Sequence, residues 1–303
     1  MIRTTLLFLS EQPWLRRWVE TSRAASMLTK RFVAGQTLEQ GISVCRRLNG
    51  EGILVSLDHL GENVTSEAEA GVSLQHYLEA LRRIREDGLK ASISIKLTQF
   101  GLNLSEALCQ KNVEALMETV CACDGFVEFD MESHSYVDRT LRIVTGAHRR
   151  FGRARAVVQA YLYRTGKDIE GLCSEKIPVR LCKGAYREPA EVAYPRKEQV
   201  NESFLRLTEI LLKHGVCPGI ATHDPRMIQH ALGFAGRIGL SKDAYEFQML
   251  YGIRRDLQAR LLADGYRLRL YVPYGNAWYP YLMRRLAERP ANLLFLAKNL
   301  MRR

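Results

Sequence analysis

The sequence lacks the features that mark membrane-spanning and disulfide-stabilised proteins. No apolar run approaches the roughly 18 residues that a transmembrane helix needs. The apolar stretch at residues 4–10 is too short for the core of a signal peptide. The seven cysteines are scattered, with no CxxC pair and no Cys/His spacing typical of metal ligands. We therefore expect free thiols in a reducing compartment, the cytoplasm.

Two common signatures of catalysis are missing as well. There is no HExxH, and the histidines have no close ligand partners in the sequence, so we expect no metal site. The glycine-rich dinucleotide fingerprint GxGxxG is also absent, because the candidates Gly233, Gly236 and Gly239 are wrongly spaced. A dinucleotide cofactor, if one binds, must be held by another kind of fold.

Positive charge is abundant, and much of it lies near the two ends. The chain has 303 residues, 47% of them hydrophobic, and a formal net charge of +11. Basic and apolar residues are mixed in the segments 14–34 and 284–303, as in amphipathic helices that bind an anionic surface. The inner face of the cell membrane is one such surface. Solvated helix faces packed on a core explain the same pattern, and a nucleic-acid or membrane-binding module is an open alternative.

The chain divides by pattern at about residue 50. Residues 1–50 have apolar residues at helical spacing and predict an N-terminal helical arm. From residue 51 to 303, short β-rich runs alternate with longer amphipathic segments. The predicted strands cover residues 53–58, 91–97, 126–131, 156–162, 178–183, 219–222, 244–249 and 267–272. Eight βα units over about 240 residues predict an α/β fold, a parallel (β/α)8 barrel of the TIM type.

In such a barrel the active site lies at the carboxyl ends of the strands. Polar residues stand at these ends in almost every predicted strand: Asp58, Lys96, Asp130, Gln159, Arg180, Lys183, Thr222, His223, Gln248 and Tyr271. A purely structural barrel would not need them, since each desolvated polar side chain costs free energy unless it finds a partner. Asp130 and Arg180 come from neighbouring odd-numbered strands and are placed to form an ion pair.

Lys96 interrupts the apolar pattern of its strand and has three interpretations. It is a Schiff-base nucleophile, as in aldolase-type barrels, a fixed charge for an anionic substrate, or one half of an ion pair within the barrel. The helix predicted after Gly275 adds two more cations. In that helix Tyr281 and Glu288 share a side with one or both of Arg284 and Arg285, and adjacent guanidinium groups can bind a carboxylate or a phosphate. An ordinary surface pair between Arg284 and Glu288 fits the same spacing.

Together these segments resemble the proline dehydrogenase family, flavoenzymes that oxidise L-proline to 1-pyrroline-5-carboxylate. The matching segments follow one another in order from residue 57 to 292 and make the resemblance specific: LDHLGE (57–62), SIKLTQFG (94–101), FDMES (129–133), VVQAYL (157–162), VRLCKGAY (179–186), ATHD (221–224), YEFQMLYGI (245–253) and YVPYGNAWYPYLMRRLAERPAN (271–292). The length is similar to that of the monofunctional bacterial enzymes.

The resemblance implies a role for each matching residue. It implies that Lys96, Arg284 and Arg285 hold the carboxylate of proline, that Tyr271 and Tyr281 close over the pyrrolidine ring, and that Asp130 and Arg180 are catalytic. It also implies FAD as cofactor, a last helix over the barrel mouth, and a quinone as electron acceptor. The implied FAD contacts are Met131, Gln159, Arg180, Lys183, Gly184, Ala185, Tyr186, Thr222 and His223.

Three positions depart from the family pattern. Cys182 replaces an aliphatic residue, Asp224 stands where Asn is commoner, and Arg187 follows KGAY where an aromatic is frequent. The last two affect the expected outer contacts of FAD. Tyr271 favours proline as substrate, because the branch that prefers hydroxyproline has a smaller residue there. We expect no nucleic acid as a partner, and contact with the membrane only at its surface.

Overall fold

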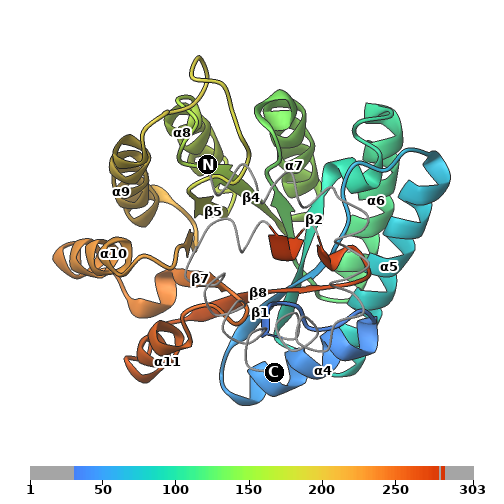
Figure 1. The fold of residues 1–303 in the computed structure, drawn as a ribbon, viewed down its shortest axis with the longest axis horizontal. Coiled ribbons are helices and arrows are strands. Elements are labelled where there is room, and N and C mark those ends of the chain that lie inside the picture. Colours follow the sequence, from blue (N-terminus) through green and yellow to red (C-terminus); the bar gives the residue numbers. More distant parts are fainter. Residues whose placement is uncertain (1–30, 280, 284–303) are drawn as a thin grey trace, which may run out of the picture.

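A computed structural model describes residues 31–279 and 281–283, and the strands in this part of the chain close into a parallel barrel (Figure 1). Each strand pairs with the next in sequence order, and β8 returns to pair with β1. The strands are β1 (Leu54–His59), β2 (Ala91–Lys96), β3 (Val127–Asp130), β4 (Ala154–Gln159), β5 (Val179–Cys182), β6 (Gly219–Ala221), β7 (Glu246–Leu250) and β8 (Leu268–Tyr274). The predicted barrel is confirmed.

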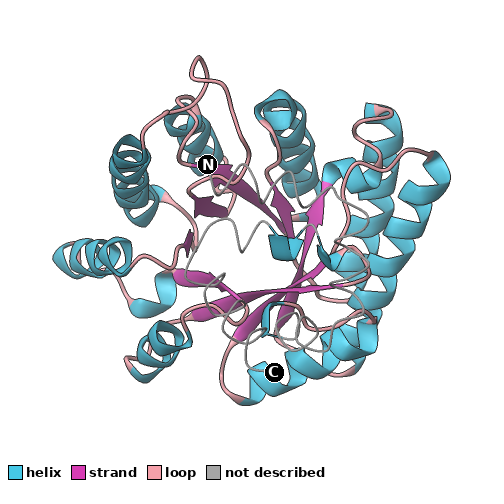
Figure 2. Cartoon of the chain, viewed as in Figure 1, coloured by secondary structure: helices cyan, strands magenta, loops and turns pink. Residues whose placement is uncertain are grey.

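Helices surround the barrel on its outer side (Figure 2). They are α4 (Leu38–Gly50), α5 (Glu67–Glu86), α6 (Glu106–Ala122), α7 (Val137–Phe151), α8 (Thr165–Ser174), α9 (Lys197–His214), α10 (Pro225–Arg237) and α11 (Arg255–Ala263). Short 3₁₀ turns cover Leu97–Phe100, His134–Tyr136 and Lys242–Ala244. Among the described residues no helix is both long enough and apolar enough to cross a bilayer.

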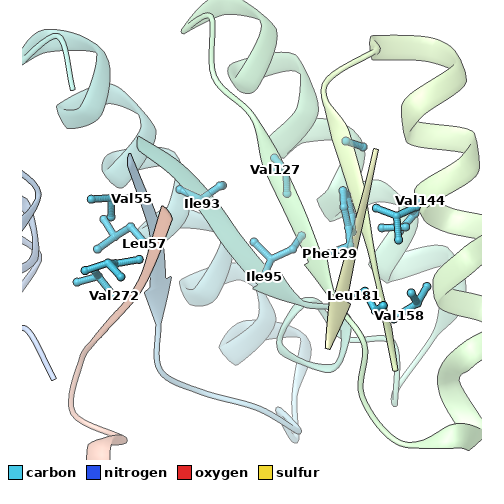
Figure 3. Close-up of a cluster of buried hydrophobic side chains, with 14 of the residues drawn as sticks. Val55, Leu57, Ile93, Ile95, Val127, Phe129, Val144, Val158, Leu181 and Val272 are labelled. Carbon is cyan, nitrogen blue, oxygen red and sulfur yellow. The ribbon is translucent and has the colours of Figure 1, made fainter. Parts of the chain in front are cut away.

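The outward faces of the strands form the main hydrophobic core. Because side chains alternate along a strand, every second residue points at the helices. In the close-up of this cluster, Val55, Leu57, Ile93 and Ile95 lie on β1 and β2, with Val144 contributed by α7 (Figure 3). Burying one such side chain contributes about 1.5–3 kcal/mol to folding.

The strand bounds differ from the sequence prediction most clearly in β4 and at the end of β8. β4 covers Ala154–Gln159 where residues 156–162 were predicted. It begins earlier because Arg155 points into the barrel, where it pairs with buried Glu128 and Glu246. β8 continues through Pro273, which was expected to end it. β7 pairs with β8 only as far as Tyr271, so the missing N–H of Pro273 costs no bond to that strand, and its carbonyl accepts from the backbone N–H of Ala34 at 2.8 Å.

The helix that covers the outside of β8 and β1 comes from the start of the described chain. α4 packs on both strands, so closely that a Cβ at Gly41 would lie 3.3 Å from Leu57 Cδ1 and from Tyr274 Cγ. In a regular barrel the helix after β8 would lie there. The first 30 residues of the predicted arm and the predicted helix from residue 284 onward lie outside the described residues.

Candidate active site

The inner surface of the barrel is unusually polar. The inward positions of the strands carry Asp58, Lys96, Glu128, Asp130, Arg155, Arg180, Glu246 and Arg269, which are as many acids as bases. Such charges are stable away from water only when they are paired and hydrogen-bonded. The strand register arranges them in an upper layer at the carboxyl ends and a lower layer beneath it.

Lys96 is the centre of the upper layer. Its Nζ lies 3.4 Å from Asp58 Oδ1, 3.6 Å from Asp130 Oδ2 and 3.5 Å from the phenol oxygen of Tyr271. The Tyr271 hydroxyl donates to Asp130 Oδ2 at 2.7 Å, and Ser94 Oγ donates to Asp130 Oδ1 at 2.8 Å. These contacts come from four different strands, so the barrel itself sets the position of the ammonium group.

The surroundings fix the charge of these groups. Burial by itself would lower the pKa of Lys96, but the carboxylates of Asp58 and Asp130 outweigh it and raise that pKa above its ordinary value. Burial, and then the same two carboxylates, raise the pKa of the Tyr271 phenol. At neutral pH Lys96 is therefore an ammonium ion and Tyr271 a neutral donor, and the lysine is a poor nucleophile for Schiff-base chemistry.

Arg180 connects the upper layer to the lower one. Its Nη1 donates to Asp130 Oδ1 at 2.7 Å, as the sequence predicted for this pair. Its Nε donates to Gln248 Oε1 at 2.5 Å, and its Nη2 contacts Glu128 Oε2. Burial lowers the pKa of Arg180 to about 10, which leaves the guanidinium protonated at neutral pH.

The lower layer consists of two glutamates and two arginines. Arg155 Nη1 lies 3.1 Å from Glu128 Oε1 and 2.5 Å from Glu246 Oε1. Arg269 Nε lies 2.8 Å from Glu246 Oε1 and 3.6 Å from Glu128 Oε1. Burial would raise the pKa of Glu246, but the two arginines hold it well below its usual range. The layer is thus a network of ion pairs below the candidate site.

The loop that follows β5 carries most of the predicted cofactor contacts. Gly184 has a φ of +114°, and a Cβ there would overlap the ring of Tyr161, so only glycine fits. Gly184 and Ala185 are exposed. Lys183 Nζ donates to Asn201 Oδ1 at 2.6 Å and lies 3.5 Å from Asp224 Oδ2. The Tyr161 hydroxyl donates to Glu188 Oε1 at 3.3 Å, which ties the loop to the end of β4.

The other predicted contacts lie at the ends of neighbouring strands. Gln159 is buried and donates from Nε2 to the Glu132 carbonyl at 2.9 Å. His223 Nε2 accepts from the Leu250 backbone N–H at 2.8 Å, so a neutral ring would carry its proton on Nδ1. Met131 and Thr222 are buried beside them, whereas Tyr186 lies farther along the β5 loop and is partly exposed.

Tyr281 packs at the same end of the barrel. It belongs to a buried cluster with Leu60, which follows β1, and Ile253, which follows β7. Residues 278, 279 and 281–283 are helical, and Figure 1 shows this short segment in red near the centre of the barrel. Arg284 and Arg285 lie outside the described residues, so their distance from Lys96 stays a prediction.

Comparison with known proteins identifies the family of the chain. The family profile described as proline dehydrogenase matches residues 42–298. Proline dehydrogenase 1 of Bacillus subtilis subsp. natto is 38% identical over 303 residues, with 100% of each chain covered. The chain belongs to the proline dehydrogenase family. The proline dehydrogenase of Deinococcus radiodurans is also 38% identical, over 307 residues that cover 100% of this chain and 98% of the relative.

Solved structures of larger family members share the fold. A crystal structure of proline utilization A from Bdellovibrio bacteriovorus, inactivated by N-propargylglycine, matches with a TM-score of 0.83 and 25% identity. The match covers 92% of this chain but only 34% of that one, so the present chain spans about a third of that protein. Proline dehydrogenases are flavin enzymes as a family.

Two of the residues that depart from the family pattern, Asp224 and Cys182, make local contacts in the structure. Asp224 caps α10 through a 3.1 Å bond from the Arg226 backbone N–H, and its carboxylate also approaches Lys183. Cys182 Sγ contacts the Val158 carbonyl at 3.4 Å, and burial raises its thiol pKa to about 11, so the sulfur stays protonated. Neither substitution disturbs the upper layer.

Sequence reasoning missed the lower layer and the part that Asp58 takes in holding Lys96. A signal was present: the strand predicted from residue 267 alternates Arg, Leu, Arg and Leu, and in a barrel covered by helices the polar alternates must point inward. The same argument applied to Arg155 and Glu128 would have placed both side chains inside the barrel, although not which groups they pair with.

Proposed function

We propose that this member of the family is an FAD-dependent proline dehydrogenase that oxidises L-proline to 1-pyrroline-5-carboxylate, the first step of proline catabolism. The observation that carries the proposal is the upper layer. A charged lysine, two carboxylates, a guanidinium and a phenol converge at the carboxyl end of a barrel whose sequence matches proline dehydrogenases over its full length.

Lys96 would bind the carboxylate of proline. Its ammonium group is held in place by Asp58 and Asp130, and its charge is fixed, so it offers a rigid anion site. Arg284 and Arg285 would complete that site from the final helix. Tyr271 and Tyr281 would flank the pyrrolidine ring and keep water from it. Such positioning of the reacting carbon lowers the barrier without a covalent intermediate.

The residues present fit a flavin dinucleotide. One short stretch offers the Arg180 guanidinium, the Lys183 ammonium and the exposed main chain of Gly184 and Ala185, which suit an electron-rich ring and a pyrophosphate. Bound FAD would supply the acceptor for the hydride that leaves C5 of proline. The other proposed contacts are Met131, Gln159, Tyr186, Thr222 and His223.

Within this arrangement Asp130 and Arg180 have the catalytic roles. Asp130 accepts from the Tyr271 hydroxyl and from Arg180, and it neighbours Lys96, so it orients three of the groups that surround the substrate. Arg180 places positive charge at the base of the site, where it favours negative charge that develops on the acceptor.

We further propose that the electrons pass to a membrane quinone and that the enzyme works in the cytoplasm, with the basic amphipathic ends touching the inner face of the membrane. The support is the mixture of basic and apolar residues in segments 14–34 and 284–303. Deletion of residues 289–303 should lower quinone reduction with vesicles that contain anionic lipid. An unchanged rate with vesicles would remove the docking role.

The decisive experiment is an absorbance spectrum. The purified chain should be yellow, and anaerobic L-proline should bleach its flavin band, whereas L-alanine, which lacks the ring, should not. A colourless protein that cannot be loaded with FAD would refute the proposal. Trapping of a carbonyl substrate on Lys96 by borohydride would instead support an aldolase-type barrel.

A further inference from the structure

Glu128 lies at the centre of the lower layer and has no solvent exposure. Its carboxylate accepts from Ser56 Oγ at 3.3 Å, from Ser92 Oγ at 3.3 Å and from Arg155 at 3.1 Å. It also contacts Arg180 Nη2. The residue therefore joins β1, β2, β4 and β5 across the inside of the barrel, directly below the group that we place at the base of the flavin site.

The charges in this layer are not shared equally. Glu246 is paired with Arg155 and Arg269 and lies 3.7 Å from Arg267, and among the described residues it forms no ion pair with Arg180. Glu128 shares the same two arginines and in addition contacts Arg180. Glu128 thus contacts Arg180 directly, whereas Glu246 acts on Arg180 from a distance and through Gln248, to which both are hydrogen-bonded.

The contacts of Arg180 leave its guanidinium little freedom. Nε is bonded to Gln248, Nη1 to Asp130 and Ser94, and Nη2 to Ser56 and Glu128. A planar guanidinium held on three sides keeps its orientation. Asp130 holds it from the upper layer, whereas Glu128 and Gln248 hold it from the interior of the barrel.

We propose that Glu128 is a positioning residue of the reaction: it fixes the Arg180 guanidinium, and its negative charge sets how strongly the site favours reduced flavin. The proposal rests on the proposed function. Without this charge, Arg180 would present an incompletely balanced positive charge to the ring. Because the reduced ring is the more electron-rich form, excess positive charge stabilises it and makes the flavin midpoint potential more positive.

The test compares two variants that each remove one buried negative charge. In Glu128→Gln the flavin equilibrium should move at least tenfold toward the reduced form, which is about 30 mV for a two-electron couple. Glu246→Gln should give less than half of that shift, because Glu246 is paired with Arg155 and Arg269 and acts on Arg180 without a direct contact. A wild-type potential in Glu128→Gln, or an equal shift in both variants, would overturn the proposal.

Glu128→Asp distinguishes the effect of the position of the carboxylate from the effect of its charge. It also tests the proposal if Glu128→Gln does not fold. It keeps the negative charge but withdraws it from Arg180 by one methylene. The kcat for proline should fall at least fivefold, with the KM and the flavin potential near those of the wild type. An unchanged kcat would refute the positioning role. A wild-type chain that binds no FAD is a different result, since it refutes the proposed function together with this inference.

Discussion

Replacing Lys96 by methionine tests the proposed substrate site most directly. Methionine keeps the length of the side chain but removes its charge. A charge-assisted hydrogen bond contributes about 1.5–3 kcal/mol, so kcat/KM for L-proline should fall about ten- to a hundredfold. The loss should appear mainly in KM, because the carboxylate is bound equally in the ground state and in the transition state. Stopped-flow reduction of the flavin over a range of proline concentrations measures both constants.

The same change has a second signature, in stability. Lys96 Nζ lies 3.4 Å from Asp58 and 3.6 Å from Asp130, and removing one partner of a buried ion pair costs about 3–5 kcal/mol. Without the cation, the two buried carboxylates of Asp58 and Asp130 repel each other, so one of them keeps a proton. The pKa of that group in the folded state is then above its unfolded value. Its contribution to stability is present at low pH and is lost as the pH rises through that raised pKa.

The stability deficit of Lys96→Met, relative to the wild type, should therefore grow in urea denaturation as the pH rises above the ordinary pKa of an aspartate. Lys111→Met is the matched control, because Lys111 is exposed on α6. It should leave KM and the pH profile unchanged. An unaltered KM in Lys96→Met would refute the carboxylate role, and a deficit that does not depend on pH would refute the ion-pair reasoning.

Three further changes test other parts of the structure. Tyr271→Ser removes the donor to Asp130 and one wall of the proposed ring site. We expect kcat/KM for proline to fall at least tenfold and the ratio of hydroxyproline to proline turnover to rise. An unchanged ratio would show that Tyr271 does not select the substrate. Gly184→Ala should weaken FAD binding at least tenfold in a fluorescence titration, because the Cβ overlaps Tyr161 at a positive φ, whereas Gly146→Ala on the exposed face of α7 should not. Burial, and then the nearby His76, lower the pKa of His59 from 6.5 to about 4. The neutral ring therefore contributes about 3 kcal/mol to the free energy of unfolding. This contribution is complete above pH 6.5 and is lost as the pH falls toward 4. His59→Gln should flatten that loss in urea denaturation, and a retained slope would assign it to another group.

The fold was predictable because its main signals are local. Each strand carries an apolar alternation that needs only its own residues to be recognised, and Gly or Asp marks most helix ends. The rim residues were predictable for a related reason. Once the strands are known to be parallel, their carboxyl ends must converge, and the structure brings Lys96, Asp130, Arg180 and Tyr271 together.

The buried network was not predictable in the same way, because its partners are distant in the sequence. Arg155 is paired with Glu128, 27 positions away, and with Glu246, 91 positions away. The strand was predicted to begin at residue 156, which left out Arg155, because nothing near it in the sequence shows that it has acidic partners on other strands. The extension of β8 through Pro273 was missed for the same reason, because the backbone N–H that bonds to the Pro273 carbonyl belongs to the distant Ala34.

The position of α4 has a consequence for how the protein folds during synthesis. Its apolar side packs on Tyr274, so α4, which is synthesised before β1, cannot complete its packing until β8 has been synthesised. Until β8 has emerged, the pairing edges of β1 and β7 have no partner, and such edges promote aggregation. A nascent chain that stops before β8 should therefore need chaperones, whereas a chain released with β8 complete can bury α4 and both edges in one cooperative step.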